Sequence, residues 1–155
     1  MKNIIFLLIL SSFMSSNNVY GQKVNCKVGD AIWVNQYYAM GVPKAYEWIS
    51  NNSYYVPKKG CFYTIELFID VKEDAPELIV NAFFAKIKDE YGYEYISEFI
   101  GPEPLLTHSS ISSGDKLRAF VTFDLPKDGR KFKFVYKDLY KKMTPLVVDL
   151  KDLKK

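Results

Sequence analysis

A single histidine and the serines that follow it are the residues of this chain that most readily suggest catalysis. His108 precedes Ser109 and Ser110 in the segment "LLTHSSISS", and an imidazole beside a hydroxyl group is the pairing that activates a serine nucleophile in hydrolases. However, neighbouring residues of an extended chain point to opposite faces, and no known nucleophile motif surrounds these serines. We therefore expect His108 to be a polar loop residue, and a hydrolase that uses His108 is the alternative.

Metal binding has little support in the sequence. A zinc site uses His and Cys at short spacing, whereas this chain has one histidine and two distant cysteines. The segment "DVKEDAPE" at 70–77 has four carboxylates but lacks the ligand spacing of a calcium loop. A solvated turn that keeps a sheet edge charged explains it better. We expect no catalytic residue, no cofactor and no metal.

Aromatic residues make up 16% of the chain and are the stronger functional signal. Several lie outside the apolar faces of the expected strands, and exposed rings on a rigid scaffold can stack on sugars or anchor a protein partner. The competing explanation is that these rings pack under an inserted helix or form cross-strand pairs on a sheet. The expected binding surface consists of Tyr37, Tyr38, Trp48, Tyr54 and Tyr55.

Period-two alternation dominates the chain and must position these side chains. In "CFYTIELFIDV" every second residue from Tyr63 to Val71 is apolar, which is typical of an antiparallel strand with one buried face. The pattern recurs at 117–125, 132–136 and 146–150, and in "NAFFAKIKD", where Phe83, Ala85 and Ile87 would share a face. With turn residues between the runs, the sequence predicts about seven or eight strands in an all-β fold, either a two-sheet sandwich or a barrel.

One segment departs from this alternation. "GVPKAYEWISNN", residues 41–52, has Pro43 where the first turn of a helix accepts it, and Ala45, Trp48 and Ile49 follow at a spacing of three to four residues. The spacing predicts a short helix or helical turn inserted between early strands.

The N-terminus has the pattern of a secretory signal peptide. Lys2 precedes an unbroken apolar run at 4–10, and small and polar residues follow as far as Gly21. The run is shorter than the roughly 20 apolar residues that span a bilayer, which argues against the alternative of a membrane anchor. We predict a signal peptide over 1–21, a single domain over 22–155, no membrane span after cleavage, and a secreted or periplasmic location.

Export would allow the two cysteines, Cys26 and Cys61, to be oxidised. In an exported protein the pair can form a disulfide, which would contribute about 3–4 kcal/mol for a loop of this length in the chain-entropy model. Two buried free thiols are the alternative, and export favours the bridge.

The charge of the chain argues against a nucleic-acid partner. The formal net charge is +3. Acidic residues are interleaved with lysines along most expected strands, whereas nucleic-acid binders usually present a concentrated basic face. We expect no nucleic-acid partner.

Five segments resemble a known family, the small secreted bacterial immunoglobulin-like domains of unknown function that are related to the mycobacterial immunoprotective extracellular antigen. Asp89, Gly92 and Tyr95 match its Asp-x-x-Gly-x-x-Tyr pattern and Gly114 its turn glycine, whereas Ser113 stands where a proline is usual. The segments are "KVGDAIWV", "FYTIELFIDVKEDAPELIV", "FFAKIKDEYGYEY", "ISSGDKLRAFVTFDLPKD" and "FKFVYKD". The resemblance implies an immunoglobulin-like antiparallel β-sandwich and brings no catalytic residue.

The sequence thus favours a secreted, non-enzymatic immunoglobulin-like module that binds a protein or glycan. Segment 36–60 and the loop at 100–114 depart from the family pattern, so we expect the binding residues there. Two alternatives stay open: a secreted hydrolase using His108, and an accessory subunit of an envelope assembly that pairs through an exposed edge strand.

Overall fold

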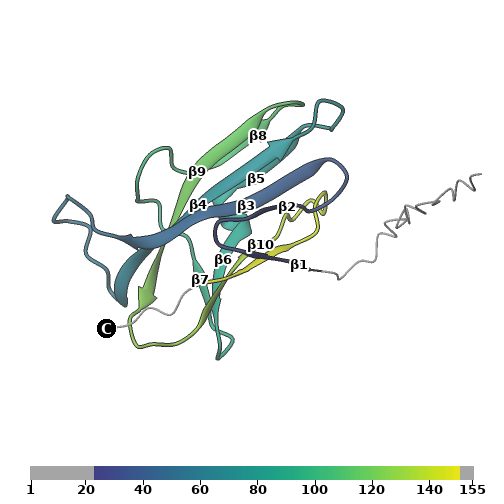
Figure 1. Ribbon diagram of the computed structural model, residues 1–155. Coiled ribbons are helices and arrows are strands. Elements are labelled where there is room, and N and C mark those ends of the chain that lie inside the picture. Colours follow the sequence, from purple (N-terminus) through teal and green to yellow (C-terminus); the bar gives the residue numbers. More distant parts are fainter. Residues whose placement is uncertain (1–22, 151–155) are drawn as a thin grey trace, which may run out of the picture.

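A computed structural model describes residues 23–150, and the predicted signal peptide lies outside them. The described chain forms an antiparallel β-sandwich, with eleven strands where seven or eight were expected (Figure 1). The strands are β1 (Val24–Lys27), β2 (Ala31–Trp33), β3 (Tyr38–Trp48), β4 (Gly60–Val71), β5 (Leu78–Asn81), β6 (Ala85–Asp89), β7 (Glu94–Ile96), β8 (His108–Ile111), β9 (Lys116–Pro126), β10 (Phe132–Tyr136) and β11 (Leu146–Asp149). No helix within 23–150 is long and apolar enough to cross a membrane.

Two sheets form the layers of the sandwich. One has the order β1-β11-β10-β6-β7, with β1 parallel to β11, and the other has the order β2-β3-β4-β9. β5 and β8 form a separate two-stranded antiparallel sheet. Turns connect β5 to β4 and β8 to β9 of the second sheet. The immunoglobulin-like sandwich expected from the sequence is therefore confirmed.

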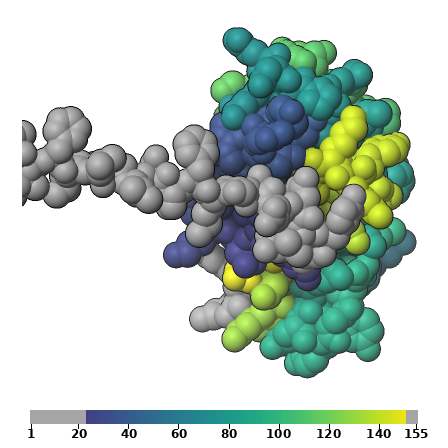
Figure 2. Space-filling view, turned by 90° about the vertical axis from the view of Figure 1, so that its right-hand side faces the viewer, coloured from purple at the N-terminus to yellow at the C-terminus, as the bar shows by residue number. Residues whose placement is uncertain are grey.

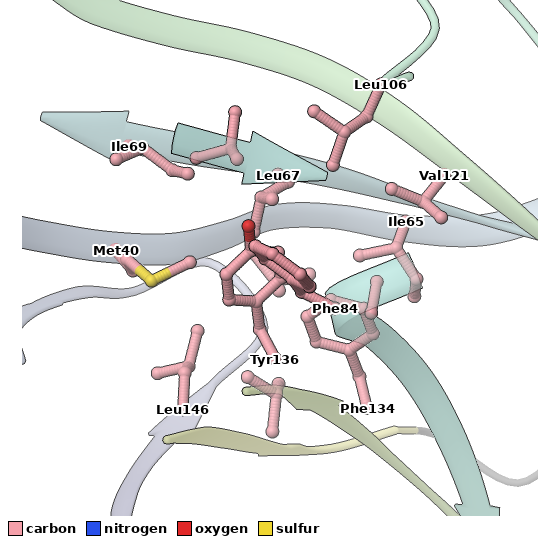
Figure 3. Packing of buried hydrophobic residues seen from close by; sticks show 14 of the residues in the cluster. Met40, Ile65, Leu67, Ile69, Phe84, Leu106, Val121, Phe134, Tyr136 and Leu146 are labelled. Atoms are coloured by element: carbon pink, nitrogen blue, oxygen red, sulfur yellow. The ribbon is translucent and has the colours of Figure 1, made fainter. Parts of the chain in front are cut away.

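Apolar side chains from both layers meet in one core (Figure 3). Ile65 and Leu67 of β4 face Phe134 of β10, and all three are fully buried. The alternation predicted for β4, β9, β10 and β11 is confirmed, because the expected apolar positions of these strands are buried, apart from Leu117 of β9, which is half-buried. The opposite face of β4 is also covered: Thr64 is buried and its hydroxyl lies 2.8 Å from that of Thr122 on β9.

The helix predicted within 41–52 is wrong. Residues up to Trp48 continue β3, whose pairing with β4 shifts between Gly41 and Lys44 so that β3 contains one extra residue. Pro43 lies in this irregularity, where a residue without an N–H is tolerated because the ladder is already interrupted. Ala45 and Trp48 lie on opposite faces of the regular part of β3, and Ile49 lies beyond its end, so their spacing has no helical meaning.

The strand predicted in "NAFFAKIKD", residues 81–89, begins later than expected. The described chain has its 3-10 turn, η1 (Ala82–Phe84), at this point, and β6 begins only at Ala85. The Asn81 side chain accepts a hydrogen bond from the Phe83 N–H and caps the turn. Ala85 and Ile87 are buried as expected, whereas Phe83 is exposed and Phe84 takes the buried position.

The free edge of β9 is partly occupied by the segment between β7 and β8. Glu98 donates its N–H to the Thr122 carbonyl at 2.8 Å, and Leu106 donates to the Phe120 carbonyl at 2.9 Å. Between these contacts Gly101 has φ of +145°, and a Cβ built there would overlap the Thr122 hydroxyl. Only glycine fits this close approach without strain.

This contact gives a stability prediction. Gly101→Ala should lower the free energy of unfolding by about 2–3 kcal/mol, because strained backbone and steric overlap add. Gly92→Ala is the matched control, since Gly92 also has positive φ (+89°) but has open space around its Cβ position; it should cost only about 1 kcal/mol. Urea unfolding measures both, and equal losses would show that the segment does not press against Thr122.

Candidate functional site

The five aromatic residues predicted as one binding surface lie in two separate places. Tyr37 and Tyr38 lie at the start of β3, whereas Tyr54 and Tyr55 follow its end. β3 has eleven residues, so at about 3.3 Å per residue the two groups are roughly 30 Å apart. Trp48, the last residue of β3, is half-buried and its ring packs on Phe62, with centroids 5.9 Å apart. The five residues therefore cannot act as one platform.

The tyrosines at the start of β3 are structural. Tyr38 is 1% exposed and donates its hydroxyl to the Pro76 carbonyl at 3.0 Å. Asn35 organises the turn before it: its Oδ1 accepts the N–H groups of Tyr37 and Tyr38, and its Nδ2 donates to the Lys142 carbonyl. This contact lies between the early and late parts of the described chain, the blue and yellow surfaces that meet in Figure 2.

The other group belongs to the loop at 49–59, the β3–β4 loop, which extends from the body of the sandwich (Figure 1). The backbone of this loop is organised by its own polar residues. Asn52 donates its N–H to the Ser50 hydroxyl, and it accepts the N–H of Tyr54 on its side chain and the N–H of Tyr55 on its carbonyl, all at 3.0 Å. Side chains of this kind replace backbone pairing in turns.

Asp124 of β9 anchors the root of the loop. Its carboxylate accepts the N–H of Lys58 at 2.8 Å and the N–H of Lys59 at 3.1 Å. Asp124 is buried, and a buried carboxylate is stable only when its oxygens are paired in this way. The loop is therefore joined to the edge strand β9, immediately before β4 begins at Gly60.

The loop exposes apolar side chains at its first residue and from its middle onward. Tyr54 is 92% exposed, Ile49 86% and Val56 66%, and Tyr55 is exposed to a lesser degree. Isolated exposed apolar residues are ordinary on protein surfaces, but several within one projecting loop mark an interaction site. We call Ile49, Tyr54, Tyr55 and Val56 the apolar tip.

The charge next to the apolar tip is positive. Residues 49–59 contain Lys58 and Lys59 and no acidic residue. Neither lysine forms an ion pair among the described residues, and Lys59 Nζ lies 6.0 Å from the centroid of the Tyr95 ring. The carboxylates nearest the root are already engaged, Asp124 by the amides described above and Glu47 by Lys127 at 2.8 Å.

A groove of about 560 Å³ lies beside the loop root. Arg130 lines it, and its guanidinium donates to the Asp89 carboxylate at 2.7 Å and to the Tyr95 hydroxyl at 3.1 Å. Burial raises the pKa of Asp89, but hydrogen bonds from Arg130, from Tyr95 and from two backbone amides outweigh it, so the pKa lies below its usual value. The groups of this network are paired with one another, so it holds the β6–β7 hairpin in place. The groove is lined by Lys59, Tyr93, Glu94, Tyr95, Ile96, Glu98, Pro126 and Arg130.

His108 is exposed at the start of β8 and does not pair with a serine. Its Nδ1 lies 3.2 Å from the Asn81 side-chain nitrogen, while the Ser110 hydroxyl donates to Glu77. Within residues 23–150 no group of three or more His, Cys, Asp and Glu residues is arranged to hold a metal ion.

The disulfide expected between Cys26 and Cys61 is not formed. Both are free cysteines and lie on strands of different sheets, β1 and β4. The Cys26 thiol is directed at the carbonyls of Lys27 and Asp30, 3.4 Å from each. Burial raises the pKa of the Cys61 thiol, which makes it less reactive.

The edge strands of the two large sheets are short or partly covered, so they leave little free backbone for a partner strand to pair with. β1, β2 and β7 have four residues or fewer, and the long edge of β9 is partly occupied by residues 98–106. On β7, hydrogen bonds from Lys86 and Lys88 lower the pKa of Glu94 to about 2. A charged side chain on a short edge strand discourages pairing.

No protein-family model matches the chain, and no curated protein matches it in sequence. Solved structures do share the fold. The yjhA protein of Bacillus subtilis has a TM-score of 0.61 at 16% identity, covering 81% of this chain and 98% of that one. MPT63, a secreted protein of Mycobacterium tuberculosis, has a TM-score of 0.61 at 11% identity, covering 84% and 99%. An uncharacterized β-sandwich protein of Clostridium difficile has a TM-score of 0.51 at 14% identity, covering 84% and 97%.

These likenesses define a class by fold alone. The expected relation to the mycobacterial antigen is confirmed as a shared β-sandwich, at a distance where sequence identity carries no function. One of the similar proteins is described as secreted.

Sequence reasoning found Tyr54 and Tyr55 but missed other members of the site. Val56 directly follows the two tyrosines and Ile49 begins the loop, so both were visible in the sequence once 41–52 was not assigned to a helix. Asp124 was assigned to the solvated face of its strand, and no sequence pattern distinguishes it from an ordinary exposed acid.

The anchor gives a second stability prediction. Asp124→Ala should lower the free energy of unfolding by about 2–3 kcal/mol, because two backbone amides lose a charged acceptor. Asp149→Ala is the matched control: this β11 carboxylate is largely exposed and its ion pair among residues 23–150 is with Lys133, at 3.4 Å, so its loss should cost less than about 0.5 kcal/mol. Equal effects in denaturant unfolding would mean that Asp124 is not an anchor.

Proposed function

We propose that this protein is an exported, non-enzymatic β-sandwich module that binds a component of the cell envelope through its β3–β4 loop. The observation that carries the proposal is the apolar tip, in which Tyr54 and Ile49 are almost fully exposed on a loop whose root is fixed to the sheet. A fixed loop loses little conformational entropy on binding, so its apolar side chains contribute more of their burial energy to affinity.

Export is supported by the signal-like N-terminal sequence and places the module in the periplasm or outside the cell. Two tyrosines suit a partner surface that is partly apolar and partly polar, which a protein, a glycan or a lipid headgroup layer can present, since tyrosine combines a flat apolar ring with a hydroxyl group. The hydrolase alternative is disfavoured because His108 is bound to Asn81 while Ser110 is bound to Glu77.

The test is binding of the exported, purified protein to envelope preparations of the bacterium that produces it. Ile49→Ser combined with Tyr54→Ser should weaken binding at least tenfold, since each removes a buried apolar anchor. Leu139→Ser combined with Tyr91→Ser is the matched control, because these two side chains are also exposed but lie outside the loop.

All variants should unfold within about 0.5 kcal/mol of the wild type, as expected for exposed positions. His108→Ala should bind like the wild type. If the loop variant binds the envelope as strongly as the control variant does, the loop is not the binding element.

A further inference from the structure

We infer that the partner of the β3–β4 loop is an anionic lipid surface, onto which the apolar tip inserts while Lys58 and Lys59 contact the headgroups. This inference rests on the proposed function, because it takes the loop as the binding element and names what the loop binds.

The first argument is the distribution of side chains along the loop. The exposed tip contains two tyrosines and two aliphatic residues, and the lysines follow at the root, beside Asp124. Tyrosine and tryptophan concentrate at the headgroup level of membranes, where a ring can be apolar on its face and hydrated at its edge. Lysine places its ammonium group among phosphates while its stem remains in apolar surroundings. The tyrosines and lysines of this one loop therefore match the chemistry of a lipid headgroup layer.

The second argument is charge. Lys58 and Lys59 have no ion pair within the described chain, and no acid lies between residues 49 and 59. The acids at the root are held by other groups, Glu47 by Lys127 and Asp124 by backbone amides. Glu98 shares the groove with Lys59 but belongs to another segment. A lysine close to an anionic membrane surface strengthens binding about fivefold.

The third argument is the hydrogen bonding of the loop backbone. Polar backbone groups without partners resist entry into lipid, and in this loop Ser50 and Asn52 engage the N–H groups of Asn52, Tyr54 and Tyr55. The loop also projects from the sandwich (Figure 1). A projecting tip needs a deep complementary pocket on a protein partner, whereas the headgroup layer of a bilayer yields around it.

The experiment is co-sedimentation of the exported, processed protein with vesicles. One set contains equal parts of phosphatidylglycerol and phosphatidylcholine, and the other contains phosphatidylcholine alone. The wild type should bind the anionic vesicles at least tenfold more tightly than the neutral ones, and added salt should weaken this binding. Ile49→Ser with Tyr54→Ser should abolish it, and Lys58→Gln with Lys59→Gln should weaken it about twenty-fivefold, from about fivefold for each lysine.

Two controls isolate the loop. Leu139→Ser with Tyr91→Ser removes exposed apolar side chains elsewhere, and Lys133→Gln removes an exposed lysine of β10. Both should bind like the wild type. All variants share one N-terminus, so any contribution from that region cancels in the comparison.

The inference is overturned if anionic vesicles do not bind the protein, or if they bind the loop variants and the controls equally. If vesicles fail while lipid-free envelope protein or glycan still binds in a loop-dependent manner, the proposed function stands and the lipid partner is wrong. If the loop variants bind both vesicles and whole envelope like the wild type, the proposed function also falls.

Discussion

The hydrogen bonds from the Lys58 and Lys59 amides to the Asp124 carboxylate determine what the rest of the molecule can do. They attach an eleven-residue loop, residues 49–59, to the long β4–β9 pair at one side of its sheet. Without this attachment the loop would be an ordinary connection, free to turn its apolar side chains onto the sandwich. With it, Tyr54 and its neighbours remain exposed to solvent, an arrangement that contributes nothing to folding and that the proposed binding function would explain.

The rest of the sandwich holds the loop in place and leaves few edge strands available for pairing with another chain. Its core fills the space between the sheets, the β9 edge is partly covered by residues 98–106, and the remaining edge strands are short. The Arg130–Asp89 pair and the Tyr95 hydroxyl fix the neighbouring hairpin in the same way that Asp124 fixes the loop. The polar groups of this network are thus engaged in holding turns, and the proposed recognition uses an apolar surface.

Much of this could be predicted from the sequence, and the failures have physical causes. Alternation identified β4, β9, β10 and β11 because each buries one face against the opposite sheet. It failed in β3, where Ala45 and Trp48 lie on opposite faces of the strand and show no period-two pattern. It also placed Phe83 in a strand, because a three-residue turn has too short a pattern to recognise. Tyr38 and Tyr54 look alike in sequence, and only the pairing of β3 shows that one is buried and the other is exposed. The role of Asp124 depends on a contact across 65 or 66 positions of sequence, which no local pattern contains.

Amide hydrogen exchange at Lys58 and Lys59 tests the central claim most directly, because these are the N–H groups that Asp124 holds. Both residues are exposed at the surface, so unanchored amides would exchange at nearly the rate of an unfolded chain. The anchored loop predicts protection of at least a hundredfold at both positions, since opening must break charged hydrogen bonds of about 1.5–3 kcal/mol each, and loss of that protection in Asp124→Ala. Unprotected amides at Lys58 and Lys59 in the wild type would contradict the claim that the apolar tip is held outward by the fold.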